Sequence, residues 1–149
     1  MQRFHAAGMG TEHPVIVIGG GPAGLMAAQT LVEAGLSVHL FDAMPSVGRK
    51  FLLAGKGGLN LTHAETFEPF LSRFGTSQAK LKPMLTAFDG AAVRAWASSL
   101  GVDTFVGTSG RVFPVNMKAA PLLRAWLRQL REPTDNRVPV TFHQRHRWV

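Results

Sequence analysis

Cysteine is absent from the 149 residues of this chain. Disulfide bonds, Cys-X-X-Cys redox chemistry, thiolate metal sites and a cysteine nucleophile are therefore excluded. Long apolar runs are lacking too, because glycines within residues 19–24 interrupt the most hydrophobic stretch well short of the roughly 18 to 20 residues that a bilayer-spanning helix needs. Residues 1–13 contain no sustained apolar segment typical of a signal peptide, and we interpret them as a flexible leader. Without an export signal or disulfides, we expect a cytoplasmic protein.

Charged residues are also few, at 17%, whereas 46% of the residues are hydrophobic, which predicts a globular domain with a core. The net charge of +7 raises the question of nucleic acid, because clustered Lys and Arg neutralise phosphates. The basic residues form two local clusters, one at residues 49–56 and one at residues 124–147, rather than one groove. We therefore disfavour nucleic acid as a partner, and the lack of long apolar runs disfavours a membrane. The oligomeric state is left open.

The first half of the chain has the pattern of a strand, a tight turn, a helix and a second strand. Residues 15–18 are a β-branched apolar run that ends at three glycines, which predicts a buried parallel strand. A helix is expected from Pro22 to Ala34, because proline in a first turn costs no intrahelical hydrogen bond and Gly35 supplies an end. Residues 38–41 are the second strand. This order predicts a right-handed parallel βαβ unit.

Later elements are predicted less uniformly. Residues 54–60 form a glycine-rich loop, and residues 63–82 are expected to be short helices joined by loops. Helices are predicted over residues 89–100, with Asp89 as N-cap, and over residues 118–131, with Pro121 in the first turn. Strand-like segments occur at residues 104–105 and 138–142. The chain lacks the further strands of a complete doubly wound sheet, so we expect a fragment. No His and carboxylate pair has metal-ligand spacing, and no metal is predicted.

The glycines after the first strand spell Gly-X-Gly-X-X-Gly at Gly19, Gly21 and Gly24. Gly19 permits the sharp turn, Gly21 lets the backbone approach a pyrophosphate, and Gly24 lets the helix pack tightly on the sheet. Asp42 follows 18 residues after Gly24, at the end of the second strand, where a carboxylate accepts hydrogen bonds from ribose hydroxyls. Ala43 follows Asp42 in place of an Arg that would bind a 2′-phosphate, which disfavours NADP at this site. The alternative is an ordinary turn in an α/β domain.

Three segments together resemble a known family. They read VIGGGPAG at residues 17–24, GRKFLLAGKGGLNLT at residues 48–62 and GRVFP at residues 110–114. The chain resembles the YhiN/BaiN-like flavoproteins, a group that includes aminoacetone oxidase, from about residue 14 to residue 149. The first motif is shared by many FAD proteins, whereas the other two are specific to this family. Many members have an Arg-Cys pair where this sequence has Gly58 and Leu59, so no role of that cysteine carries over.

The resemblance implies an FAD-dependent oxidoreductase of α/β class, with a Rossmann-like βαβ unit and parallel sheet followed by a partly helical insertion. It divides the chain into a leader at residues 1–13, an FAD-binding unit at residues 14–62 and a mixed segment at residues 63–149. FAD is the expected cofactor, supporting hydride transfer to an unidentified small-molecule substrate, and NAD(P)H is a candidate reductant. The expected cofactor-binding residues are Gly19, Gly21, Pro22, Ala23, Gly24, Asp42, Ala43, Gly48, Arg49, Lys50, Gly57, Gly58, Asn60 and Thr62.

Within the second motif, backbone N–H groups at Gly55, Gly57 and Gly58 would approach the pyrophosphate or flavin, and Asn60 would donate to a flavin carbonyl. A solvated basic loop is the alternative. Arg111 would bind an anionic group or stabilise a loop, and His63 would lie near the flavin or act as an ordinary polar residue. Catalytic residues are not assigned. Two rival functions stay open for the whole chain, a basic non-catalytic module that binds nucleic acid and an inactive truncated product.

Overall fold

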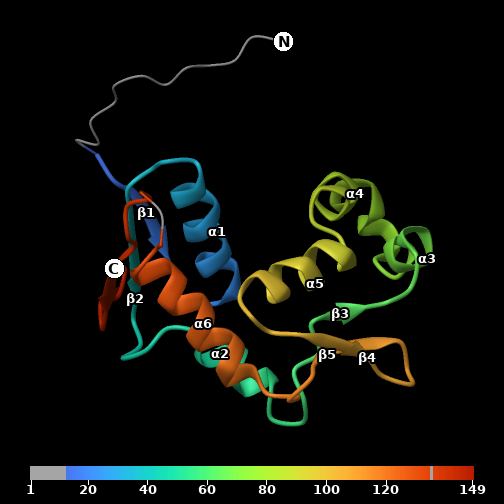
Figure 1. Ribbon diagram of the computed structural model, residues 1–149. Coiled ribbons are helices and arrows are strands. Elements are labelled where there is room, and N and C mark those ends of the chain that lie inside the picture. The colour runs from blue at the N-terminus through green and yellow to red at the C-terminus, as the bar shows by residue number, and fades with distance from the viewer. Residues whose placement is uncertain (1–12, 135) are drawn as a thin grey trace. The chain divides into compact units, whose positions relative to one another are not determined.

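The computed structural model describes residues 13–134 and 136–149, and this part of the chain divides into two compact units (Figure 1). Unit 1 contains the residues up to Arg49 together with Arg128–Val149, and unit 2 is Lys50–Leu127. The predicted flexible leader at residues 1–13 lies outside the described residues except for His13. The division by sequence placed a boundary at residue 62, and this boundary stays a prediction.

Unit 1 is built on a parallel three-stranded sheet in the order β1-β2-β6 (Figure 1). Its strands are β1 (Val15–Ile18), β2 (Val38–Asp42) and β6 (Thr141–Gln144). The two predicted strands are confirmed, and β6 adds a third parallel strand beside β2. The strand expected over residues 138–142 begins only at Thr141. Pro139 is one reason why the strand begins later than predicted, because a proline has no N–H to donate to a neighbouring strand.

Helix α1 (Pro22–Glu33) connects β1 to β2 and contacts both strands. Its buried Leu25, Ala28 and Val32 share the core of unit 1 with Val38 and Leu40 of β2. Leu25, Ala28, Leu31 and Val32 recur at helical spacing, which gives α1 one apolar face. Gly35 follows the helix with φ +81°, a left-handed conformation that favours glycine. The predicted strand, turn, helix and strand are therefore confirmed.

Helix α6 (Ala119–Arg131) begins in unit 2 and ends in unit 1. The helix predicted here is confirmed, and it is amphipathic, because Leu123, Trp126 and Leu130 are buried whereas its arginines are exposed. In unit 1, the carbonyl of Leu130 accepts a hydrogen bond from Val140 N–H at 2.8 Å. The guanidinium of Arg131 lies 5.0 Å from the centre of the Phe142 ring. These two contacts join the end of α6 to the residues at the start of β6.

Unit 2 combines short helices with an antiparallel sheet in the order β3-β5-β4 (Figure 1). The strands are β3 (Thr62–His63), β4 (Thr104–Val106) and β5 (Arg111–Pro114). The helices are α2 (Arg49–Ala54), whose first residue still belongs to unit 1, α3 (Phe67–Ser72), the 3-10 turn η1 (Gly75–Ser77), α4 (Gln78–Ala87) and α5 (Gly90–Ser99). The expected short helices between residues 63 and 82 are thus found.

The core of unit 2 forms around buried Leu59, Ala97, Ala119 and Leu122. Trp126, which is 1% exposed, makes edge-to-face contacts with Phe51 and Trp96. The predicted N-cap of α5 is confirmed, because the Asp89 carboxylate accepts the Ala92 N–H at 2.8 Å. In residues 13–134 and 136–149, every helix falls short of the length and apolar character that crossing a bilayer requires.

Candidate functional site

The glycine turn between β1 and α1 has the geometry that its sequence predicts. Gly19 has φ +99°, in the left-handed region, and its N–H donates to Phe41 O at 2.8 Å. A Cβ at Gly24 would overlap the carbonyl oxygen of Gly19, so α1 can pack this closely on the turn only with glycine there. Two of the three motif glycines are therefore required by the fold itself.

Gly21 differs, because a Cβ built on it meets no atom within 4 Å and its φ of −79° suits any residue. Gly21 is the N-cap of α1 and offers no side-chain cap, so no side chain of its own covers the first-turn N–H groups of Ala23 and Gly24. Pro22 stands at the first helical position, where a missing N–H costs nothing. The result is an open cradle at the positive end of a helix dipole, which fits a pyrophosphate.

Asp42 lies at the end of β2 and is hydrogen-bonded to the turn. One carboxylate oxygen accepts Gly20 N–H at 2.6 Å, and the other accepts Met44 N–H at 2.7 Å. The carbonyl of Gly20 accepts Gly48 N–H at 2.7 Å. Gly20 is buried, and a Cβ there would overlap the side chain of Val47. Unit 1 thus brings the predicted Asp42 and Gly48 to the glycine turn, together with Gly20 and Val47, which the sequence analysis did not select.

The segment after β6 reaches the same end of the sheet. Arg145 N–H donates to Met44 O at 3.1 Å, and His146 N–H donates to Asp42 O at 3.0 Å. Arg145 has φ +62°, an uncommon conformation for a residue with a side chain. Ligands of open parallel sheets bind outside the carboxyl ends of the strands, which is where Arg145 and His146 lie. Sequence reasoning missed them, because only the pairing of β6 with β2 brings them there.

The glycine-rich segment of unit 2 contains glycines of two kinds. A Cβ at Gly55 would stand 2.6 Å from the Ala119 Cβ, and one at Gly58 would stand 2.6 Å from Met117 Cε. These two glycines accommodate neighbouring side chains, and Gly58 also has φ +114°. Gly57 meets nothing within 4 Å. Three glycines, Gly55, Gly57 and Gly58, were expected to approach a cofactor. Of these, Gly57 has open space beside it in which a cofactor could lie.

The other predicted residues around this segment lie at the surface or in backbone pairing. Arg49, Lys50 and Lys56 are exposed. Thr62 pairs with Val112 in the sheet of unit 2. The side-chain amide of Asn60 is oriented so that its nitrogen faces two backbone carbonyl oxygens. It donates to Thr62 O at 2.8 Å and to Val112 O at 3.3 Å. To donate to a flavin carbonyl, Asn60 would have to give up one of these two bonds.

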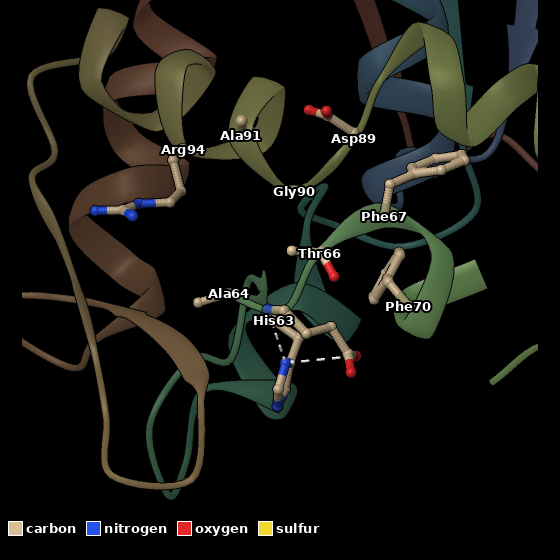
Figure 2. Close-up of a pocket in the computed structure, with 10 residues that line it drawn as sticks. His63, Ala64, Thr66, Phe67, Phe70, Asp89, Gly90, Ala91 and Arg94 are labelled. Carbon is tan, nitrogen blue, oxygen red and sulfur yellow. Dashed lines mark hydrogen bonds and ion pairs between the residues drawn. The ribbon is translucent and has the colours of Figure 1, made fainter. Parts of the chain in front are cut away.

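His63 borders a cavity of about 270 Å³ that Figure 2 shows between α3 and the start of α5. Its Nδ1 accepts Glu65 N–H at 3.2 Å, so Nε2 carries the proton and donates to Ser109 O at 3.0 Å. Arg73 binds Glu65 through two nitrogens, at 2.5 and 2.9 Å. This hydrogen bonding lowers the pKa of Glu65 from its ordinary value and raises that of Arg73. Both ring nitrogens of His63 therefore serve the local fold.

Arg111, in the third sequence motif, starts β5 and is exposed. Its carbonyl accepts Gly107 N–H at 2.8 Å, and its backbone pairs with His63. Gly110 has φ +76°, and a Cβ there would stand 2.5 Å from the His63 ring. The glycine of this motif is thus explained by packing, whereas the role of the Arg111 side chain stays a prediction.

The family model described as HI0933-like protein Rossmann domain matches residues 13–149. The chain therefore belongs to this family, as the three motifs indicated, and its fold is α/β and Rossmann-like with a small antiparallel insertion. Members of the family bind FAD, and the homologues of this chain are FAD-dependent oxidoreductases.

Several curated relatives match parts of the chain. Digeranylgeranylglycerophospholipid reductase of Methanosphaerula palustris is 42% identical over 55 residues, which cover 37% of this chain and 14% of that protein. Ribosomal RNA dihydrouridine synthase of Haemophilus influenzae is 46% identical over 50 residues, which cover 34% of this chain and 12% of that protein. The crystal structure of Thermovibrio ammonificans THI4 aligns with a TM-score of 0.45 and 17% identity, covering 88% of this chain and 38% of that one.

Proposed function

We propose that this chain supplies the ADP-binding part of the FAD site in a flavin-dependent oxidoreductase. The observation that carries the proposal is the open cradle at Gly21, where the N-terminus of α1 offers backbone N–H groups and positive potential. Gly19 and Gly24 are required by the fold around it, whereas nothing in the fold requires glycine at Gly21. A glycine that packing does not explain is what a closely approaching pyrophosphate demands.

In this proposal the residues of unit 1 bind and orient the cofactor. The first turn of α1, from Pro22 through Gly24, receives the pyrophosphate, and Asp42 accepts hydrogen bonds from the ribose. Ala43 and Gly48 line the same end of the sheet. For Lys50, Gly57, Asn60 and Thr62 of unit 2, a role in cofactor binding stays what the second sequence motif predicts. When bound, FAD supplies the hydride chemistry, with NAD(P)H as the proposed reductant and a small molecule as the proposed substrate.

The test is the visible absorption spectrum of the purified protein, followed by release and quantification of any flavin. We expect FAD to copurify with the protein or to saturate it on titration, and the Gly21→Val variant to lose this binding. Gly35→Ala is a suitable control, because Gly35 also has open space around it but lies at the opposite end of α1. A protein that takes up no FAD at any concentration tested would refute the proposal.

A second candidate makes nucleic acid the substrate or partner. It is supported by the net charge of +7 and by the name of the Haemophilus influenzae relative, a ribosomal RNA dihydrouridine synthase. Binding to a ribosomal RNA fragment, measured at two salt concentrations, separates the candidates, because phosphate contacts weaken steeply with salt. Salt-sensitive binding by a flavin-loaded protein favours RNA as substrate. The same binding without flavin favours the non-catalytic module, and no binding favours a small molecule.

A further inference from the structure

Gly20, the residue between the first two motif glycines, is hydrogen-bonded through both its N–H and its C=O. Its N–H donates to the Asp42 carboxylate at 2.6 Å, and its carbonyl accepts Gly48 N–H at 2.7 Å. The residue is buried, and a Cβ would stand 2.9 Å from Asp42 Oδ2 as well as overlapping Val47. Gly20 therefore has little freedom to move within the turn.

The position of Gly20 decides how the helix presents its N-terminus. Gly21 follows directly as the N-cap of α1, and its carbonyl accepts the first helical hydrogen bond, from Leu25 N–H at 2.9 Å. A rotation at Gly20 would turn Gly21 and the N–H groups that follow it. Without the carboxylate, the buried Gly20 N–H would lose its partner, which is costly in a buried position.

We propose that Asp42 is a positioning residue, whose carboxylate fixes Gly20 and so aims the first-turn N–H groups of α1 at the pyrophosphate. A carboxylate has about four lone-pair positions, and the bonds to Gly20 and Met44 use two of them. The others remain for the ribose, so the two roles coexist. The claim that the N–H groups point at a pyrophosphate rests on the proposed FAD function. The claim that the Asp42 carboxylate fixes Gly20 does not.

The first experiment compares FAD with an FAD analogue whose adenosine ribose lacks both hydroxyl groups, using the parent chain and Asp42→Asn. The side-chain amide of this variant has one acceptor oxygen, which can accept only one of the N–H groups of Gly20 and Met44. Its NH₂ group then faces the other N–H, and two donors cannot form a hydrogen bond. If Asp42 positions the turn, Asp42→Asn weakens both ligands, by about tenfold or more each. If the carboxylate serves the ribose alone, the variant weakens FAD only and leaves the analogue unchanged, which would overturn the proposal.

The second experiment measures hydrogen exchange of the Gly20 amide without any flavin. We expect the amide to be protected in the parent chain and to exchange much faster in Asp42→Ala, which removes both acceptor oxygens, while α1 amides from Ala28 onward keep their protection. Unchanged protection of Gly20 would overturn the proposal. Because no ligand is present, this result holds even if the chain proves not to bind FAD, so the failure of either idea can be recognised separately.

Asp89→Asn is the matched control, because Asp89 also accepts a backbone N–H, that of Ala92, but caps α5 in unit 2. It should change exchange at Ala92 and leave both Gly20 and FAD affinity unaltered. A cooperative thermal transition verifies that each variant is folded. If Asp42→Asn fails to fold, Asp42→Glu retains the charge while moving the carboxylate by one methylene, and the same comparisons apply to it.

Discussion

Replacing Gly21 with valine should separate cofactor binding from stability. The backbone at Gly21 has φ −79°, and a Cβ there meets no atom within 4 Å, so the fold has room at the position where the branched side chain begins. Valine is a poorer N-cap than glycine, and we expect a loss of roughly 1 kcal/mol in unfolding free energy. The side chain would then occupy the cradle in front of α1, where the pyrophosphate is proposed to lie.

The effect on binding should be much larger than the effect on stability. Displacing the pyrophosphate removes at least two charge-assisted hydrogen bonds from the backbone, which contribute about 1.5 to 3 kcal/mol each. The expected loss is therefore at least ~3 kcal/mol, or a hundredfold or more in affinity. Gly21→Ala places only a methyl group in the cradle and should fall between the parent and Gly21→Val.

The assay is a fluorescence titration of FAD against each variant, combined with thermal melts in the absence of flavin. Gly35→Ala controls for lost backbone freedom, because Gly35 adopts φ +81° and an alanine there is strained by about 1 to 2 kcal/mol. It should lower the melting temperature without changing FAD affinity. If Gly21→Val bound FAD as tightly as the parent chain, the assignment of this turn to the pyrophosphate would be wrong.

Three further predictions concern stability. Gly24→Ala forces a Cβ onto the Gly19 carbonyl and should cost about 1 to 3 kcal/mol in unfolding free energy even without flavin, measurable by denaturant titration. Trp126→Ala removes a buried ring from the core of unit 2 and should cost about 3 to 5 kcal/mol by the same measurement. Burial, and then the nearby His39 and His146, lower the pKa of His143 from 6.5, so its contribution is present above pH 6.5 and is lost as the pH falls toward the lowered value. Melting temperatures above and below pH 6.5 should show this loss in the parent chain and a smaller one in His143→Asn.

The elements predicted correctly from the sequence are those that local patterns determine. The β-branched run before Gly19, the proline at the start of α1 and Gly35 after it specify β1 and α1 within about twenty residues of chain. Asp89 specifies the start of α5 in the same way, through one hydrogen bond to a residue three positions later. Such signals need no knowledge of the rest of the fold.

The features that sequence reasoning missed depend on contacts between distant residues. His39 of β2 pairs with Thr141 of β6, more than a hundred positions later, and a short strand gives no local sign of its partner. The strand itself was expected, but not its place beside β2. The same pairing brings Arg145 and His146 to the end of β2. Gly20 and Val47 were missed because their contact requires the chain to return to the turn after Asp42.

Glycine is the residue for which the sequence alone is least informative, because several physical demands select it. Gly24 and Gly55 are glycine because a neighbouring atom takes the space of a Cβ, whereas Gly19 and Gly58 are glycine because their φ values are +99° and +114°. Gly21 and Gly57 have open space, and φ of Gly21 is ordinary, so neither packing nor backbone strain accounts for glycine at Gly21. Glycine is also a favoured N-cap, but a ligand that approaches the backbone closely is what the proposed FAD site adds. Gly21 is therefore the first residue to substitute when FAD binding is tested.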